Sequence, residues 1–418
     1  MMKKIAIVGA GISGLTAGHL LHRHHEITLF EAAPVLGGHT ATVDVNLDGQ
    51  SHAVDTGFIV FNDRTYPHFL RLLDRIGVAR QATEMSFSVK SATGLEYNGH
   101  NLDTLFAQRR NLLRPGFYRF IREILRFNRE AKAWLAEEGK EVEPGLTLGR
   151  FLQEGRFSDY FARHYILPMG AAIWSSTLAD MRGFPLGFFL RFFDHHGLLN
   201  VANRPQWYVI PGGSRQYIAP LTRGWQARVR LASPVQAIFR TERGVRIHSR
   251  HGEEAFDEVI LACHSDQALG LLRDASADEQ RLLGAMAYQA NDVWLHTDAT
   301  CLPTRPKAWA SWNYQLGEGE TQRPLVSYNM NILQGIRTRE ALCVSLNPQG
   351  QVDEGKVLRR FVYEHPVFNL GSLAAQEQRM QICGQRHTHF CGAYWYNGFH
   401  EDGVRSALDV TRRFGVDL

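Results

Sequence analysis

The first thirty residues alternate between short apolar runs and a helical pattern. Residues 4–8 (KIAIV) form a short run rich in β-branched side chains, which is typical of a buried parallel strand. The spacing of apolar positions then predicts a helix over residues 12–25 and a second strand over residues 26–30. A strand, a helix and a second strand in this order predict the beginning of a doubly wound α/β domain.

Three glycines join the first predicted strand to the helix. Gly9, Gly11 and Gly14 fit the pattern GxGxxG. In this position the first glycine permits a tight turn, the second lets the backbone approach a pyrophosphate, and the third lets helix and strand pack closely. Glu31 ends the second strand, where an acidic side chain accepts hydrogen bonds from a ribose. The segment predicts a dinucleotide site that disfavours NADP, because Glu31 would repel a 2′-phosphate, and it leaves NAD and FAD equal.

Further glycines and apolar runs follow along the chain. Gly37 and Gly38 lie on the loop after the second strand, where they allow close backbone access to a cofactor or form a simple tight turn. Residues 229–262 predict a β-meander that ends in the continuous apolar run VILA. Apolar residues recur at helical spacing from Val404 to Phe414. We expect this second helix to offer its free amino-terminal amides to an anionic or polar ligand group.

Length and composition narrow the class of protein. A chain of 418 residues predicts two domains, and 44% hydrophobic with 21% charged residues argues against disorder. The net charge of +4 is too small to indicate nucleic-acid binding. Five dispersed cysteines without a CxxC pair predict reduced thiols and a cytoplasmic location. The amino terminus has the charge and apolar run of a signal peptide, but glycines interrupt that run, so we interpret it as strand, turn and helix.

Motifs along nearly the whole chain resemble those of the flavin amine oxidase, protoporphyrinogen oxidase and phytoene desaturase superfamily. Within it, the sequence is similar to bacterial NAD/FAD-binding, amine-oxidase-like flavoproteins. These resemble the oxidase-like domain of some plant cyclopropane fatty acid synthases, and their genes often neighbour bacterial synthase genes. The more specific segments are DTGFIVFNDRTYP (55–67), LFAQRRNLLRP (105–115), LPMGAAIWSS (167–176), HSDQAL (264–269), ASWNYQ (310–315) and GFHEDG (398–403).

The resemblance implies an FAD site assembled from residues far apart in the sequence. The pyrophosphate would be held by Gly9, Gly11, Ser13 and Gly14, and the adenosine ribose by Glu31. The diphosphate and ribityl chain would run along Gly37, Gly38 and His39. His39 stands where many relatives have Arg, so its phosphate contact is a weaker expectation.

The same resemblance indicates which residues would contact the flavin ring and the adenine. Gly57 and Phe58 would approach the isoalloxazine, and Val235 would clamp the adenine through its backbone with Ala262 nearby. Backbone amides would reach the ribityl chain and the flavin pyrimidine carbonyl from Asp402, Gly403 and Val404. Such amides at a helix amino terminus would stabilise negative charge on a reduced flavin.

The expected fold is α/β, a discontinuous Rossmann-like FAD domain with an inserted α+β substrate domain. The FAD domain comprises residues 1–80, 205–265 and 385–418, and the substrate domain residues 81–204 and 266–384. The expected enzyme is an FAD-dependent oxidoreductase that transfers a hydride from a substrate carbon to the flavin. We assign no catalytic side chain from the sequence.

Lysine usage argues against an amine substrate. Many amine-oxidising relatives place a lysine in the substrate domain, but none occurs here between Lys140 and Lys307. The aromatic position beside the flavin, often Tyr in amine oxidases, is Phe399. An amine or polyamine oxidase stays the first alternative, and a non-catalytic flavin-binding partner of a lipid-modifying enzyme stays the second.

Apolar and basic segments favour a fatty acyl or lipid substrate. Residues 184–193 (FPLGFFLRFF) are apolar on more than one face, and residues 117–135 predict an amphipathic helix within a basic cluster that spans residues 109–132. Such a helix either lies on an anionic membrane or packs on the core with a solvated basic face. The first alternative predicts a peripheral location at the inner membrane surface.

Two further groups of residues could belong to a substrate pocket or a metal site. The polar and aromatic residues Trp312, Asn313, Tyr314, Asn329 and Asn331 either line the substrate pocket with Phe399 or only pack around it. Cys383, His387, His389 and Cys391 match no familiar zinc spacing, so we predict no metal site.

Overall fold

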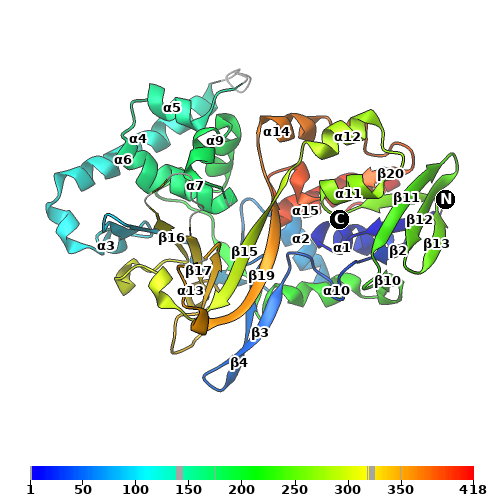
Figure 1. Cartoon of the computed structure of the whole chain (residues 1–418), viewed down its shortest axis with the longest axis horizontal. Helices are drawn as coiled ribbons and strands as arrows, with labels where there is room; N and C mark the ends of the chain where they lie inside the picture. Colours follow the sequence, from blue (N-terminus) through cyan, green and yellow to red (C-terminus); the bar gives the residue numbers. More distant parts are fainter. Residues whose placement is uncertain (1, 138–144, 175, 318, 320–324, 349) are drawn as a thin grey trace.

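The computed structural model describes residues 2–137, 145–174, 176–317, 319, 325–348 and 350–418. Two lobes lie side by side, each with its own sheet (Figure 1). The first lobe carries both chain termini and the second carries most of the helices between residues 102 and 195. The mixed α/β fold is the predicted one.

A five-stranded parallel sheet forms the centre of the first lobe. Its strands lie in the order β10 (Val229–Arg230), β2 (Glu26–Phe30), β1 (Lys4–Val8), β14 (Glu258–Leu261) and β20 (Thr388–Phe390). Ile5, Ala6 and Ile7 are fully buried, as expected for a parallel strand covered on both faces. Strands distant in sequence therefore meet in one sheet, whose carboxyl edge carries the glycine loop.

Helices α1 (Ile12–Leu21), α2 (Pro67–Ile76), α10 (Ile218–Thr222) and α15 (His400–Thr411) accompany this sheet. The predicted first helix ends four residues early, at Leu21, and residues 22–24 form a turn in which the His24 N–H donates to the Leu21 carbonyl at 2.9 Å. The predicted carboxy-terminal helix is present as α15.

The predicted β-meander is shorter than the sequence suggested. Only β11 (Val235–Thr241), β12 (Gly244–Ser249) and β13 (Gly252–Phe256) form an antiparallel sheet. The runs at 229–230 and 258–261 join the parallel sheet instead. Residues 252–256 (GEEAF) are polar and mostly exposed, so they carry no apolar run that could mark a strand.

A seven-stranded sheet forms the base of the second lobe. Its strands lie in the order β19 (Val357–Pro366), β15 (Tyr288–His296), β18 (Cys343–Leu346), β17 (Leu325–Asn329), β16 (Trp312–Leu316), β7 (Phe87–Ser91) and β8 (Glu96–Asn98). The long antiparallel pair of β15 and β19 runs along the junction between the lobes (Figure 1).

Helices cover the second lobe. They are α3 (Leu102–Leu105), α4 (Pro115–Ala136), α5 (Leu148–Glu154), α6 (Asp159–Phe161), α7 (Leu167–Trp174), α8 (Leu178–Arg182) and α9 (Leu186–His195). The remaining strands and α-helices are β3 (Thr42–Leu47), β4 (Gln50–Asp55), β5 (Phe61–Asn62), β6 (Gln81–Thr83), β9 (Trp207–Val209), α11 (Ser265–Leu271), α12 (Ala277–Gly284), α13 (Met330–Leu333) and α14 (Leu370–Glu377). No described helix is long and apolar enough to cross a bilayer.

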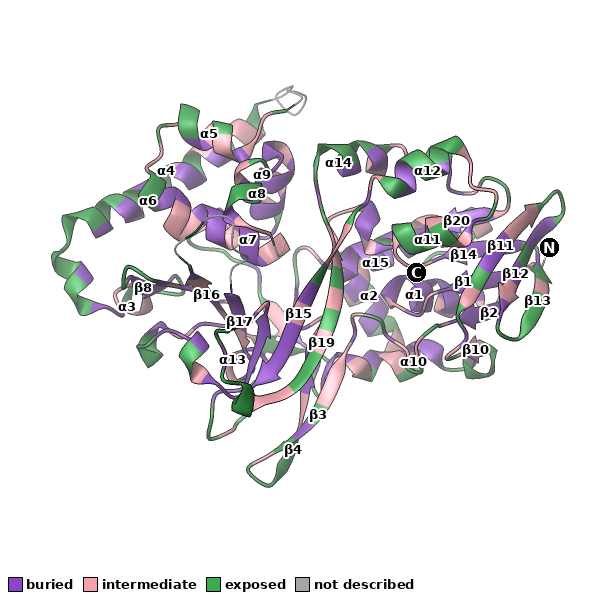
Figure 2. Ribbon diagram, viewed as in Figure 1, coloured by how far each residue is buried: buried purple, intermediate pink, exposed green. Residues whose placement is uncertain are grey.

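The two largest buried clusters among the described residues follow the two lobes, and two smaller ones pack on the seven-stranded sheet. The first core gathers side chains from residues 5–73, 210–286 and 375–410, and the second from residues 89–199 and 314–368 (Figure 2). Residues 268–286 and 375–383 therefore pack with the first sheet, although the sequence interpretation assigned them to the substrate domain. We propose to move both segments to the FAD domain and to keep the other boundaries as predicted.

The apolar faces of α4 and α9 are buried inside the second lobe. Phe117, Phe120 and Phe127 of α4 are buried, and Phe127 packs against Phe161 with ring centroids 5.6 Å apart. Six aromatic or leucine side chains of α9 are also buried. The helix over residues 117–135 therefore packs on the core and exposes its basic face, and contact of that face with an anionic membrane stays a prediction.

Candidate cofactor site

The loop between β1 and α1 has the backbone geometry of a phosphate-binding turn. Gly9 has a φ of +102°, and its N–H donates to the Phe30 carbonyl at 2.8 Å. A Cβ at Gly14 would lie 1.9 Å from the Gly9 oxygen, so only glycine allows this approach. A Cβ on Gly11 would instead meet no described atom within 4 Å beyond its chain neighbours. The space in front of Gly11 is open, as a ligand that approaches the backbone requires.

The loop of residues 37–39 lies beside this turn. The Gly37 N–H donates to the Ala10 carbonyl at 3.0 Å, and a Cβ at Gly38 would lie 3.2 Å from the Gly11 Cα. On the other side, a Cβ at Gly57 would lie 2.2 Å from the His39 carbonyl oxygen, and the Phe58 N–H donates to that oxygen at 2.7 Å. The loop thus connects the glycine turn to residues 57–58.

Two helix amino termini lie together at the same place. A Cβ at Gly403 of α15 would lie 2.6 Å from Cγ2 of Ile12 and 3.1 Å from Oγ of Ser13. No side chain caps α1 among the described residues, so its first amides are open to a ligand. The positive ends of both helices stabilise an anionic or polar group placed between them.

Asp402 caps the second of these helices. Its carboxylate accepts the Phe399 N–H at 2.9 Å. Burial, with a smaller contribution from the Glu401 charge, raises the pKa of Asp402 to about 7 against that hydrogen bond. The side chain therefore holds the helix start, while Gly403 and Val404, both buried, continue its first turn.

Glu31 is already engaged by the backbone. Its two carboxylate oxygens accept the N–H groups of Ala10 at 2.7 Å and Ala33 at 2.8 Å. Each oxygen keeps a second lone pair, so a ribose hydroxyl can still donate to it. The Ser233 N–H donates to the Glu31 carbonyl at 2.7 Å, which sets Val235 and the start of β11 near this end of the site. A Cβ at Gly9 would lie 2.9 Å from the Ala262 oxygen, so Ala262 borders the turn itself.

A ring stack that the sequence did not reveal joins residues 57–58 to α15. The rings of Phe58 and His400 lie 3.6 Å apart with their planes at 10°. The Nε2 of His400 lies 3.1 Å from both the Tyr217 hydroxyl and the Thr40 Oγ1. Burial lowers the pKa of His400 far below its ordinary value and keeps its ring neutral.

Three histidines from distant segments meet at the junction of the lobes. The ring of His39 lies 5.3 Å from that of His365 and 6.3 Å from that of His264. Burial, with smaller contributions from charges on neighbouring histidines, lowers the pKa of His39 to about 4 and that of His365 to about 3. The Nε2 of His39 is buried without a hydrogen-bond partner among the described residues. His264 begins the motif HSDQAL (264–269), one of the more specific segments of the sequence, but only the tertiary structure brings the three rings together.

Aromatic side chains surround Phe399 at the seam between the two cores. Its ring lies 5.2 Å from that of Phe192 and 5.9 Å from that of His196. Nearby, Phe188 stacks on Phe368 at 5.3 Å. Residues of the apolar segment 184–193 therefore reach the amino terminus of α15, a placement that periodicity alone did not predict.

The predicted polar pocket residues are largely engaged within the protein. Asn313 accepts from Ser88 and from the Ala310 N–H, and it donates to two carbonyls. Asn329 caps α13 and Asn331 fixes the segment 336–342. Tyr314 is buried, and Trp312 packs edge-on against Tyr328 at 5.2 Å. These contacts favour a packing role for the five residues and leave Phe399 as the pocket candidate.

Every described lysine is engaged away from this site. Lys307 pairs with Asp103 at 2.6 Å, and Lys90 donates to the carbonyl of Thr300 at 2.7 Å. The partners of the others are Glu258 for Lys3, Phe256 for Lys4, Asn200 for Lys132 and Asp298 for Lys356. Lys140 lies outside the described residues.

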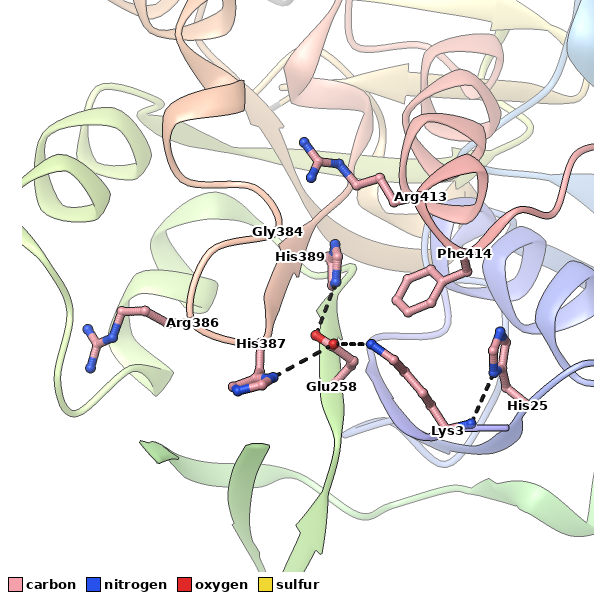
Figure 3. A pocket seen from close by; sticks show the side chains of 9 residues that line it. All are labelled: Lys3, His25, Glu258, Gly384, Arg386, His387, His389, Arg413 and Phe414. Carbon is pink, nitrogen blue, oxygen red and sulfur yellow. Dashed lines mark hydrogen bonds and ion pairs between the residues drawn. The ribbon is translucent and has the colours of Figure 1, made fainter. Parts of the chain in front are cut away.

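A separate polar pocket lies at the opposite edge of the parallel sheet. Lys3, His387 and His389 all contact the carboxylate of Glu258, which begins β14 (Figure 3). Burial opposes ionisation of Glu258, but hydrogen bonds from His389 and Lys3 outweigh it and hold its pKa at about 2. Phosphate sites of parallel sheets lie at the carboxyl edge, so this pocket is not the cofactor site.

One cluster in the described part of the chain has the composition of a metal site. Ligand atoms of His296, Cys301 and Cys343 lie within 4.8 Å of one another. Both nitrogens of His296 are already used, because Nδ1 accepts the Asp298 N–H and Nε2 bonds the Ser345 hydroxyl at 2.7 Å. The histidine keeps no free lone pair in this arrangement, so the cluster does not support a metal.

The fold and the glycine-lined site together define a two-domain, dinucleotide-dependent oxidoreductase. The model of the flavin-containing amine oxidoreductase family matches residues 12–358, and the chain belongs to that family. It is therefore a flavin-dependent oxidoreductase with FAD as its cofactor.

Individual relatives are similar over different lengths. The zeta-carotene desaturase of Zea mays is 36% identical over 75 residues, which cover 18% of this chain and only 12% of the relative. Two solved structures match nearly the whole chain. A fatty acid isomerase from P. acnes that produces CLA has a TM-score of 0.71 at 15% identity and covers 99% of this chain and 98% of its own. The cyclohexylamine oxidase of Brevibacterium oxydans IH-35A has a TM-score of 0.71 at 14% identity. The match covers 99% of this chain and 100% of the oxidase. At these identities the two structures show the shared fold.

Proposed function

We propose that the protein oxidises a fatty acyl or other lipid substrate and leaves a carbon–carbon double bond. Two hydrogens leave the substrate, one as a hydride to FAD and one as a proton to solvent. When bound, FAD supplies the hydride acceptor. The residues of this chain bind it, orient the substrate and exclude water.

The observation that carries this proposal is the apolar seam at Phe399. Phe192 and His196 border it, and burial lowers the pKa of His196 to about 4, so its ring is uncharged. No described lysine lies at the seam. Such surroundings favour an uncharged hydrocarbon segment over an ammonium group. A relative named for a desaturation and a full-length structural neighbour named for a fatty acid further support the proposal.

We propose the cofactor contacts that the sequence predicted. Three observations support them: the open space at Gly11, the paired amino termini of α1 and α15, and the unpartnered Nε2 of His39. Gly9, Gly11, Ser13 and Gly14 would bind the pyrophosphate and Glu31 the ribose. Amides of residues 402–404 would stabilise negative charge at the flavin pyrimidine.

An amine oxidase is the second candidate. The family and the cyclohexylamine oxidase structure favour it. The placement of Lys307, which pairs with Asp103 on α3, weighs against it.

Anaerobic flavin bleaching separates these functions. We expect the purified yellow protein to lose its absorbance near the flavin maximum with unsaturated fatty acids or phospholipids, and to keep it with putrescine or cyclohexylamine. Bleaching by amines alone, with hydrogen peroxide formed in air, would establish the second candidate instead. Bleaching by neither class overturns both and leaves the flavin-binding partner of a lipid-modifying enzyme. A colourless protein that FAD does not reconstitute would contradict the cofactor assignment itself.

A further inference from the structure

Large apolar side chains are exposed together at the outer end of the second lobe. Five of the fourteen exposed large hydrophobic residues in the described chain fall between residues 102 and 125. Leu113 is 88% exposed, and Leu112 beside it is 45% exposed. Both lie in the short 3₁₀ helix Arg109–Leu113 between α3 and α4, which protrudes on the side away from the first lobe (Figures 1 and 2). We call Leu112 and Leu113 the leucine tip.

The exposed face of α4 continues from the leucine tip. Tyr118, Arg122, Leu125 and Arg129 follow at spacings of four, three and four residues, so they form one stripe along the helix. The Tyr118 hydroxyl donates to the Leu112 carbonyl at 3.0 Å and so ties the stripe to the tip. Phe117, Phe120 and Phe127 occupy the opposite face and are buried. The stripe therefore lies on a different side of the helix from the apolar face that the helical periodicity predicted.

Charge on this helix is divided between its two faces. The guanidinium groups of Arg114, Arg119, Arg122 and Arg129 are exposed, and none forms an ion pair within the described part of the chain. The acids of α4 lie elsewhere. Glu123 is buried and accepts the Ser158 N–H at 2.9 Å, and Glu130 pairs with Arg126 at 3.6 Å. The outer stripe consequently presents positive charge without compensating carboxylates.

We propose that the leucine tip and the outer stripe of α4 dock the protein on an anionic lipid bilayer. Leucine side chains enter the boundary between headgroups and acyl chains, while arginines beside them bind lipid phosphates. A nucleic acid would satisfy the arginines but offers no apolar phase for Leu113. This docking does not rest on the proposed substrate.

Vesicle binding by the purified, FAD-loaded protein tests the docking surface. We expect sedimentation with phosphatidylglycerol-containing vesicles at low salt, weakening as salt rises, and little binding to pure phosphatidylcholine. The double variant Leu112→Ser/Leu113→Ser should weaken binding by about tenfold or more at every salt concentration. The double variant Arg122→Gln/Arg129→Gln should weaken it by about tenfold at low salt and reduce the salt dependence.

Matched controls come from exposed residues elsewhere. Val201→Ser, with a side chain 70% exposed, and Arg223→Gln/Arg243→Gln, in the first lobe, should change vesicle affinity by less than about twofold. Unchanged FAD content and circular dichroism will show that each variant is folded. The proposal is overturned if the wild type does not bind anionic vesicles, if the tip and stripe variants bind as well as the wild type, or if only nucleic acid binding depends on the arginines.

Membrane docking and the proposed lipid oxidation can be tested independently of each other. Flavin reduction by a soluble fatty acid needs no vesicle, so the tip variant should retain it. Loss of vesicle binding with intact reduction supports docking, and vesicle binding without reduction by any lipid leaves docking intact and removes the substrate proposal.

Discussion

The rings of Phe58 and His400 stack 3.6 Å apart and connect the segment after β4 to the first residue of α15. Phe58 is predicted to border the flavin ring, and α15 contributes the amides that would meet its pyrimidine edge. The stack therefore holds together two parts of the candidate cofactor site that are more than three hundred residues apart in the chain.

His400 contributes both to the stack and to a hydrogen-bond network. His400→Leu removes the ring and the bonds to Thr40 and Tyr217, and should lower the free energy of unfolding by about 2–4 kcal/mol. His400→Phe keeps a ring opposite Phe58 and should cost only about 1–2 kcal/mol. Urea unfolding, with FAD content read from absorbance, measures both. Equal losses in the two variants would show that the stack contributes nothing.

Gly11 and Gly14 should respond differently to the same added methyl group. At Gly11 the φ of −69° suits any residue and the Cβ faces open space, so Gly11→Ala should change the stability of FAD-free protein by less than about 0.5 kcal/mol. Because that methyl group occupies the predicted pyrophosphate position, FAD affinity should fall by about tenfold or more.

Gly14→Ala is the matched comparison. Its Cβ would lie 1.9 Å from the Gly9 oxygen, so we expect a loss of about 2–4 kcal/mol in unfolding free energy, even without FAD. Calorimetric FAD titration and thermal unfolding distinguish the two effects. A Gly11→Ala protein that binds FAD as tightly as the wild type would place the pyrophosphate elsewhere.

Asp402 should make the fold more stable in mild acid than at neutral pH. Folding raises its pKa from an ordinary value of 3.8 to about 7, mainly through burial, so the folded state binds the proton more tightly. That contribution is fully present below about pH 3.8 and is lost as the pH rises through about 7.

Asp402→Asn keeps an oxygen acceptor for the Phe399 N–H and removes this titration. The unfolding free energy of the wild type should therefore fall relative to that of the variant between pH 4 and pH 7. Denaturant titrations across this range provide the measurement. Curves that run parallel at every pH would rule out the raised pKa.

Lys307 tests the amine-oxidase alternative. It pairs with Asp103 and is half-exposed, so Lys307→Met should leave the rate of flavin reduction within about twofold for any reducing substrate. Rapid-mixing absorbance under nitrogen provides the rate. Selective loss of reduction by amines, with FAD retained, would bring this lysine into the mechanism.

Much of the geometry of the candidate cofactor site was predictable because its signals are local. Gly9, Gly11 and Gly14 must follow a strand and begin a helix, and Glu31 must end the next strand, so a short window contains the complete pattern. Val404 and the apolar residues after it likewise define α15 by spacing alone. The three-strand extent of the meander was not predictable, because residues 252–256 pair as a strand without an apolar run.

The roles of polar and aromatic side chains depended on contacts between distant segments. Asn313 resembles a pocket residue in sequence, yet Ser88 and Ser327 use its hydrogen-bonding groups. His39 and His365 carry no shared motif, and only the crossing of a loop and β19 brings their rings to 5.3 Å.

The sequence by itself determined the flavin-binding architecture, since glycine conformation and apolar periodicity act within a few residues of the chain. Tertiary structure decided which face of α4 is covered and which is exposed, because a periodicity of 3.6 residues identifies a face but not its partner. It likewise decided that Phe192 of α9 meets Phe399 at the seam. Packing of the two cores, and no local pattern, sets that contact.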